Sequence, residues 1–495
     1  MKYIVLLTSL LIPPLSFADN NMDSYFNTLK NNPQKFSAFL LAMPKGGDLH
    51  NHLAGATYAE NMIKSATKDN FCIDPKSYTA TEANNCSPSY QISKIPLKPV
   101  FYNLTIDAWS MRNFTPGTET GHDHFFATFD KFFAVYAKHT GEALAEVVGR
   151  AGTENEKYLE LMVTPDNDAS GMLGKKIGWD ANLAQLRSKL LAGGLKPIIA
   201  ASSEQINKDE AILHSQLHCV TPQAQAGCGI TVRYLYQVLR EQAPEAVFAQ
   251  LLTGFELASK DPRFVGINMV QAEDGPISMR DYDLHMKMVG FLHTLYPKVN
   301  ITLHAGELTS ALVPTQGLTF HIRDAVEIAH AQRIGHGVDI MHETNADQLL
   351  QEMAKKHIAV EINLTSNDVI LNVKGDQHPL PIYLKYNVPV VLSTDDEGVN
   401  RSNLTKEYQR AVQTYNLSYT TLKNIDRNSL TYSFVGGKSL WANPEMFIVV
   451  GECQNDPLGA ANPSKTCQAF LTQNKKAQLQ WQLEQDFDKF EKKFM

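Results

Sequence analysis

Short apolar runs rich in β-branched residues recur along the chain, and each is followed by a polar or glycine-containing turn. Eight of these runs predict β-strands, separated mostly by stretches of helical periodicity such as Ala181–Leu191 and Ile322–Ala331. Near-continuous apolar strands that alternate with helices are typical of a parallel barrel, so we predict a (β/α)8 barrel of the TIM type. The predicted strands are Asp48–Leu53, Tyr158–Val163, Ile230–Tyr236, Phe264–Val270, Val299–His304, Arg333–Gly337, Ile358–Leu364 and Val388–Ser393.

Two segments of the chain are additions to a minimal barrel. Residues from about 65 to 125, between the first two predicted strands, are rich in Asn, Ser and Pro and predict an insertion. Residues from about 440 to 495 predict a C-terminal extension that ends in a charged helix near Gln478–Phe494. Because a large barrel can absorb such additions around one core, we predict a single domain over residues 19–495.

The first residues have the pattern of an export signal. Lys2 supplies a positive charge, Tyr3–Leu15 an apolar core, and Ser16-Phe17-Ala18 the small residues of a cleavage site. We therefore expect residues 1–18 to be a signal peptide and the remaining chain to act in the periplasm or outside the cell, with a buried N-terminal helix as the alternative. No later window has about 18 uninterrupted apolar residues, so we expect no membrane span and a soluble mature protein.

The net charge and the spacing of the cysteines narrow the class of protein further. The net charge of −7 argues against a nucleic-acid partner, because no basic excess is available to neutralise phosphates. The six cysteines fall into three close pairs, which in an exported chain fit three disulfides that each close a short loop. Free buried thiols are the alternative. The pairs are Cys72 with Cys86, Cys219 with Cys228, and Cys453 with Cys467.

Metal-competent side chains lie at the C-terminal ends of the predicted strands, where barrel enzymes carry their active sites. The first strand contains His50-Asn51-His52, and because residues i and i+2 of a strand point to the same side, both imidazoles face the barrel mouth. The fifth strand ends in His304, and Asp395 follows the eighth. Three histidines and one aspartate suit Zn²⁺. We therefore predict one zinc ion per chain at this mouth.

The motifs around these residues resemble the adenosine/AMP deaminase family, and their order and spacing hold from about residue 43 to 437. Two further stretches, Tyr415–Leu417 and Asn428–Phe434, are similar to the secreted adenosine deaminase-related growth factors of that family. The resemblance is compatible with a homodimer. The motifs are Met43–Leu53, Leu303–Glu307, Arg333–Gly337, Asn363–Asn367 and Ser393–Asp396.

The resemblance implies a role for each matching residue. It implies that Glu307 protonates N1 of the purine, that His336 orients the attacking water and helps to deprotonate it, and that Asp396 hydrogen-bonds N7. These roles agree with elementary chemistry, because a carboxylic acid kept protonated in a dry pocket can deliver a proton to the ring as water adds to C6. The implied zinc ligands are His50, His52, His304 and Asp395.

Two positions depart from the family pattern. Ala54 stands where the family usually has a ribose-contacting aspartate. Gln271, in the run that leads to Glu273, stands where the family usually has a glycine whose backbone N–H approaches purine N3. We expect Gln271 and Glu273 to lie at the substrate. Aromatic residues between the first two strands predict an apolar lid over a purine, with ordinary core packing as the alternative; they are Trp109, Phe125, Phe126 and Phe129.

The sequence thus predicts a zinc-dependent hydrolase that deaminates adenosine and 2′-deoxyadenosine to the inosine form with release of ammonia. The first alternative is a zinc hydrolase of another aminopurine or a modified nucleoside, which the two departures keep open. AMP is less attractive, because no Arg/Lys cluster accompanies the motifs to bind a phosphate. An alternative of another class is an exported nucleoside-binding or signalling protein without catalysis; intact Glu307 and His336 argue against it.

Overall fold

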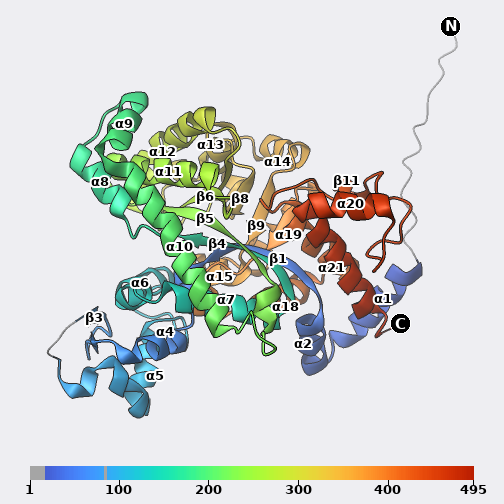
Figure 1. Ribbon diagram of the computed structural model, residues 1–495, viewed down its shortest axis with the longest axis horizontal. Helices are drawn as coiled ribbons and strands as arrows, with labels where there is room; N and C mark the ends of the chain where they lie inside the picture. The colour runs from blue at the N-terminus through green and yellow to red at the C-terminus, as the bar shows by residue number, and fades with distance from the viewer. Residues whose placement is uncertain (1–16, 83–85, 495) are drawn as a thin grey trace, which may run out of the picture.

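The computed structural model describes residues 17–82 and 86–494, so most of the predicted signal peptide, residues 1–16, lies outside the described residues (Figure 1). Eight parallel strands form one sheet in the order β1-β4-β5-β6-β7-β8-β9-β10. All eight predicted strands are confirmed, and the fold is a (β/α)8 barrel. The strands are β1 Lys45–His52, β4 Glu156–Val163, β5 Thr231–Leu239, β6 Phe264–Val270, β7 Asn300–Ala305, β8 Arg333–His336, β9 Ala359–Ile362 and β10 Val390–Leu392.

Helices connect consecutive strands and cover the outside of the barrel (Figure 1). The predicted helix Ala181–Leu191 is found as α9, whereas the predicted helix Ile322–Ala331 is shorter and ends at Glu327. The helices between β1 and β10 are α3 Leu53–Ala56, α4 Ala59–Ser65, α5 Pro99–Ala108, α6 Gly121–Tyr136, α7 Thr140–Thr153, α8 Ala169–Ile177, α9 Leu183–Leu190, α10 Lys196–Gln216, α11 Pro244–Lys260, α12 Pro276–Leu295, α13 His321–Glu327, α14 Ala346–Lys355, α15 Leu364–Leu371 and α16 Leu380–Lys385.

Burial explains why most of the strands are rich in apolar residues. A strand of a parallel barrel faces the barrel interior on one side and the helices on the other, so neither face can be polar without a partner. The outer helices follow the opposite rule. In α14, Leu349, Leu350 and Met353 are buried and the intervening residues are polar, which is the pattern of a helix with one face on the core.

Backbone hydrogen bonds join the first and last strands at the barrel mouth. The N–H of Asp395 donates to the carbonyl of His50 at 2.8 Å, and the N–H of His52 donates to the carbonyl of Asp395 at 3.1 Å. These two bonds form a parallel bridge between Asn51 and Asp395. The barrel is therefore closed at residues that the sequence predicts as zinc ligands.

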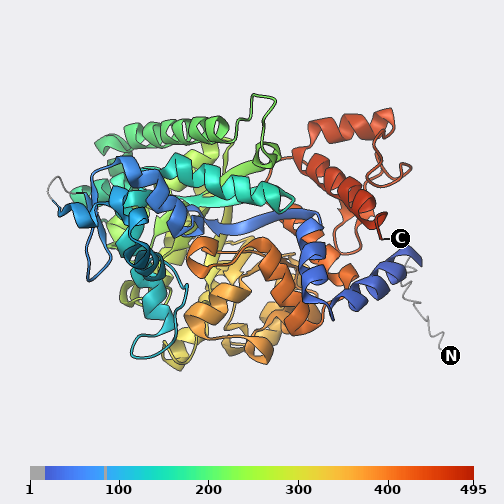
Figure 2. The ribbon, with the colours of Figure 1, turned by 90° about the horizontal axis from the view of Figure 1, so that it is seen from below.

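The segment predicted as an insertion contains a small antiparallel pair of strands, β2 Phe71–Ile73 and β3 Ala80–Glu82, followed by α5 and the start of α6. The Cys72–Cys86 disulfide closes the loop of this pair. A second disulfide, Cys219–Cys228, closes the loop that precedes β5. Figures 1 and 2 both place the predicted insertion, with β2, β3 and α5, on the side of the barrel away from the C-terminal extension.

The C-terminal extension packs around its own apolar cluster. It follows α17 Glu397–Asn400, α18 Leu404–Tyr415 and α19 Tyr419–Thr431, and it comprises the short pair β11 Trp441–Asn443 and β12 Ile448–Val449 with helices α20 Lys465–Gln473 and α21 Lys475–Glu491. The helix predicted over Gln478–Phe494 is α21. The cluster contains Leu440, Trp441, Cys453, Cys467, Phe470, Leu471, Ala477 and Trp481.

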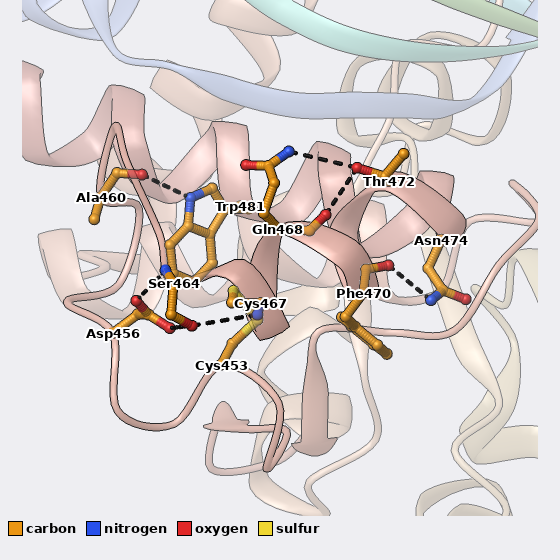
Figure 3. The surroundings of a disulfide bond; sticks show 10 residues. All are labelled: Cys453, Asp456, Ala460, Ser464, Cys467, Gln468, Phe470, Thr472, Asn474 and Trp481. Atoms are coloured by element: carbon orange, nitrogen blue, oxygen red, sulfur yellow. Dashed lines mark hydrogen bonds between the residues drawn. A yellow bond between two sulfur atoms is a disulfide. The ribbon is translucent and has the colours of Figure 1, made fainter.

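Figure 3 shows how the Cys453–Cys467 disulfide is placed within this cluster. The hydroxyl of Ser464 accepts a hydrogen bond from the N–H of Cys467 and donates one to Asp456, which fixes the start of α20. The indole N–H of Trp481 donates to the carbonyl of Ala460 at 3.0 Å. The disulfide thus joins a long irregular loop to a helix at the centre of the extension.

The two ends of the described chain meet beside this extension. The helices α1 Phe17–Leu29 and α2 Pro33–Ala42 precede the barrel (Figure 2). The ring of Tyr25 in α1 stacks on that of Phe494, with the centroids 5.2 Å apart. Among the described helices, none has both the length and the apolar character needed to cross a membrane.

Removal of the Cys453–Cys467 disulfide tests how much the extension depends on it. The double variant Cys453→Ala/Cys467→Ala should lower the free energy of unfolding by about 3 kcal/mol, because the bond closes a loop of about 15 residues. Urea denaturation followed by tryptophan fluorescence measures this loss, since Trp441 and Trp481 lie in the cluster. Cys219→Ala/Cys228→Ala, outside the cluster, is the matched control. An unchanged urea midpoint in the first variant would contradict this account of the extension.

Candidate active site

Four side chains from three parts of the barrel converge at its mouth. His50 and His52 come from the end of β1, His304 from β7, and Asp395 from the turn after β10. All four are buried, and their ligand atoms lie within 4.8 Å of one another. The Nε2 atom of His304 is 3.1 Å from the Nε2 atoms of both His50 and His52, and Oδ1 of Asp395 is 3.1 Å from Nε2 of His52. The four predicted ligands are therefore brought together.

The outer nitrogen of each histidine faces an oxygen that accepts a hydrogen bond. An Nδ1 atom that donates to such an oxygen leaves its Nε2 atom with a lone pair. Three lone pairs and one carboxylate oxygen thus point at a common centre, and a cation there relieves their repulsion. The set of three nitrogens and one oxygen fits a metal ion. The distances from Nδ1 to the accepting side-chain oxygen are 2.6 Å for His50 and Glu361, 2.9 Å for His52 and Gln237, and 2.9 Å for His304 and Asn268.

The pKa of His50 shows how strongly this centre favours positive charge. Burial alone would lower that pKa, but hydrogen bonds to Asp395 and Glu361 outweigh burial and raise it to about 10. Burial would likewise raise the pKa of Glu361, but Arg333 and His50 lower it to about 2, so Glu361 stays ionised. Arg333 donates to Glu361 at 2.6 Å and to Glu160 at 2.5 Å in the barrel interior.

Left-handed backbone occurs at several strand ends around the site. His336, Asp395 and Gln271 have φ values of +68°, +60° and +77°. Such values are uncommon for residues with a side chain and are retained where the surroundings impose them. They turn the chain sharply where each strand leaves the barrel, which aims His336 and Asp395 toward the centre.

Glu307 follows β7 and lines the cavity beside the metal-capable centre. Burial raises its pKa well above the usual range, and the nearby carboxylates of Asp395 and Glu273 raise it further. Its Oε1 atom has no hydrogen-bond partner among the described residues and lies 3.5 Å from Nδ1 of His336. Burial and these carboxylates thus favour the protonated form of Glu307, which can donate a proton to a bound molecule.

Glu273 lies behind Glu307 rather than on the cavity wall. Its carboxylate accepts hydrogen bonds from the backbone N–H groups of Gly306 and Glu307 at 3.0 and 2.8 Å. It also pairs with Nδ1 of His321 at 2.6 Å. The structure thus places Glu273 as a support for the turn that carries Glu307.

Gln271 lines the cavity with its side chain turned aside. Its Oε1 atom accepts the N–H of Glu241 at 2.8 Å, and its carbonyl accepts two hydrogen bonds from Arg240. With φ of +77°, Gln271 adopts a backbone conformation that glycine takes readily. The side-chain amide of Gln271 is thereby fixed to the backbone of Glu241.

A cavity of about 640 Å³ opens beside the metal-capable centre. The helix α6 covers it with an aromatic face, because Phe126, Phe129 and Phe133 follow one another at helical spacing. Trp109 does not line it; this residue is buried against Phe132 instead. The lining side chains are His52, Ala54, Phe125, Phe126, Phe129, Asp130, Phe133, Ala134, Gln237, Leu239, Glu241, Val270, Gln271, Ala272, His304, Glu307, Ile370, Asp395 and Asp396.

Apart from His52 and His304, the ionisable residues of this lining are all acidic: Asp130, Glu241, Glu307, Asp395 and Asp396 carry carboxyl groups, and no lysine or arginine is present among the described lining residues. Asp396 is buried, and burial together with the Asp395 carboxylate raises its pKa well above the usual range. As for Glu307, the protonated form of Asp396 is favoured. The cavity combines these two carboxyl groups with apolar walls.

Sequence reasoning missed the residues that support the site. Gln237, Asn268 and Glu361 orient the three histidines, yet no motif led to them. Each is a polar residue inside an otherwise apolar strand, which is itself a usable signal because an unpaired polar side chain is costly in a barrel core. Phe133 and Asp130 were missed because α6 reaches the cavity only through tertiary packing.

Comparison with known proteins agrees with this geometry. A segment of the chain is 36% identical over 138 residues to an adenosine deaminase of Clostridium perfringens, and the match covers 27% of this chain and 37% of that protein. A longer segment of the chain is 29% identical over 234 residues to the N6-methyl-AMP deaminase of Danio rerio, and this match covers 46% of this chain and 60% of that protein. The match therefore spans little more than a third of the Clostridium protein.

Solved structures share the fold. A zinc-bound amidohydrolase from Burkholderia ambifaria superposes with a TM-score of 0.58 at 15% identity, covering 98% of this chain and 97% of that one. The sequence profile of the family named Adenosine deaminase matches residues 117–440, well over half of the chain. From this match and the buried site at the barrel mouth, the chain belongs to the adenosine deaminase family.

Proposed function

We propose that the protein is a zinc-dependent hydrolase that deaminates adenosine and 2′-deoxyadenosine to the inosine form and ammonia. The observation that carries the proposal is the placement of two buried carboxyl groups, Glu307 and Asp396, beside the metal-capable centre in one largely apolar cavity. A purine needs such donors, because its ring nitrogens are hydrogen-bond acceptors. The cavity of about 640 Å³ is ample for a nucleoside.

Zinc fits the donor set, since four-coordinate sites of imidazole and carboxylate ligands are typical of this ion. His50, His52, His304 and Asp395 would hold it. When bound, zinc would supply an activated water near neutral pH, because it lowers the pKa of water from 15.7 to about 7. The Nδ1 partners of the three histidines turn the Nε2 atoms toward the centre.

The two acids have distinct tasks in this proposal. Glu307 delivers its proton to N1 of the purine as water adds to C6, so the ring accepts the addition without building up negative charge. Of the two protons of that water, one leaves with the amino group as ammonia and the other restores Glu307. Asp396 donates a hydrogen bond to N7 and thereby fixes the orientation of the base. Glu273 holds the turn of Glu307 through two backbone N–H groups. The backbone of Gln271, rather than its side chain, faces the base.

The charge of the cavity favours a nucleoside over a nucleotide. Asp130 on α6 and Glu241 after β5 are the carboxylates of the lining that lie outside the metal-capable centre and its acids. A phosphate in this cavity would meet carboxylates and find no cation among the described lining residues. The lining thus supports adenosine and deoxyadenosine against AMP and its N6-methyl form.

We also propose that the protein acts outside the cytoplasm. Three disulfides, each closing a local loop, are typical of an oxidising compartment. The export pattern of residues 1–18 and the likeness of Tyr415–Leu417 and Asn428–Phe434 to the secreted branch of the family support the same proposal.

A substrate panel tests the proposed reaction. Zinc-loaded protein should convert adenosine and 2′-deoxyadenosine to products with the ultraviolet spectrum of inosine and deoxyinosine. For AMP, kcat/KM should be lower by roughly 100-fold or more, because placing like charges together costs several kcal/mol. Asp130→Asn removes one carboxylate from the lining and should therefore reduce the difference in kcat/KM between adenosine and AMP. No turnover of any adenine nucleoside would contradict the proposed reaction, and equal turnover of AMP would contradict the role given to the acidic lining.

Two variants separate the acid from the ligands. Glu307→Gln should retain zinc and lower kcat by about 10²–10⁴-fold, the range for a lost general acid. His304→Ala should lose zinc, because a ligand is removed, and excess Zn²⁺ should restore it only in part. Zinc content measured by mass spectrometry, together with kcat, distinguishes the two. Loss of zinc from Glu307→Gln with retention in His304→Ala would show that the roles are assigned wrongly.

A further inference from the structure

A line of hydrogen bonds leads from the start of α16 to His336 through two buried side chains that the reaction proposed above does not use. The backbone N–H of Leu380 donates to Nδ1 of His378 at 3.1 Å. Nε2 of His378 is 3.0 Å from Oδ1 of Asn367 in α15, and Nδ2 of Asn367 is 2.9 Å from Nδ1 of His336. The line therefore ends beside the metal-capable centre.

The direction of each bond follows from its first donor. A backbone N–H can only donate, so Nδ1 of His378 accepts. Burial, with Arg410 nearby, lowers the pKa of His378 to about 4, so this imidazole is neutral near pH 7 and carries its single proton on Nε2. That proton is donated to Oδ1 of Asn367. The amide NH₂ of Asn367 consequently faces His336 and donates to its Nδ1 atom.

The proton of His336 is thereby assigned as well. Nδ1 of His336 lies 2.9 Å from Nδ2 of Asn367, which can only donate, so Nδ1 carries no proton. Since Nδ1 accepts from Asn367, the single proton lies on Nε2. Asn363 favours neither nitrogen, because its Nδ2 atom is 3.5 Å from both.

We propose that Asn367 and His378 are positioning residues that hold His336 in the tautomer with its proton on Nε2, so that His336 presents a hydrogen-bond donor to the reacting centre. Nε2 lies on the side of Asp395, 3.9 Å from Oδ2. In this tautomer His336 stabilises negative charge on the attacking oxygen, and its Nε2 atom takes no proton from water. The inference therefore differs from the expectation, drawn from the family resemblance, that His336 helps to deprotonate water.

The tautomer can be observed directly in the zinc-loaded protein. Nitrogen-15 NMR distinguishes a protonated from an unprotonated imidazole nitrogen, and the signals of His336 are identified by their absence in His336→Gln. At pH 7 we expect Nε2 to be protonated and Nδ1 unprotonated. A wild-type ring with its proton on Nδ1 overturns the inference. This measurement needs no turnover, so it can succeed where the proposed deamination fails.

An isosteric substitution tests whether Asn367 sets the tautomer. Asn367→Asp replaces the donor that faces His336 by an acceptor, so the proton should move to Nδ1 and the two nitrogen signals should exchange their character. The kinetic part of this test relies on the proposed function. There, kcat for adenosine should fall by roughly 10²–10⁴-fold with zinc content and KM little changed, since a reversed histidine tautomer lowers kcat about 10⁴-fold in serine proteases.

His378→Gln is the matched control at the far end of the line. Glutamine is also neutral and keeps an N–H donor for Oδ1 of Asn367, so the tautomer of His336 should remain that of the wild type. A merely structural role predicts instead that both variants leave the tautomer unchanged. If Asn367→Asp retains the wild-type nitrogen signals, or if His378→Gln reverses them, the line does not position His336 and the inference is wrong.

Discussion

The approach of three imidazole nitrogens and one carboxylate oxygen at the barrel mouth is the constraint on which the rest of the site depends. The Nε2 atoms of His50 and His52 both lie 3.1 Å from that of His304, which is too close for unprotonated nitrogens without positive charge between them. The barrel interior prepares this centre from behind. Arg333 keeps Glu361 ionised, and Glu361 in turn holds the proton of His50 on the nitrogen that faces away from the centre.

The fold and the site share their key contacts. The backbones of His50, His52 and Asp395 close the barrel between its first and last strands, while their side chains form the metal-capable centre. Changes that disturb one will therefore disturb the other. The additions to the barrel are more independent. Helix α6 contributes an aromatic face to the cavity, whereas the disulfide-linked C-terminal extension contributes none of the residues that line it.

Much of this arrangement can be predicted from the sequence, because it is written in local patterns. Short apolar runs predicted the strands. The spacing of His50 and His52 predicted that both imidazoles point the same way, since alternate residues of a strand share a side. Contacts between distant segments carried no such signal. Glu361 and Asn367 act through partners on other strands and helices, and the conformation of Gln271 depends on Glu241. The early end of α13 at Glu327 likewise reflects packing rather than local periodicity.

The most direct test of the central claim is a calorimetric titration of metal-stripped protein with Zn²⁺, with wild type and Glu361→Gln measured side by side. Glu361 touches no ion in this account and acts only by holding the His50 proton away from the centre. We predict one zinc ion per chain for wild type and an affinity about 10–100-fold lower for the variant, the usual effect of losing such a partner. Failure of the wild type to bind zinc, or equal affinities for the two proteins, would contradict the account.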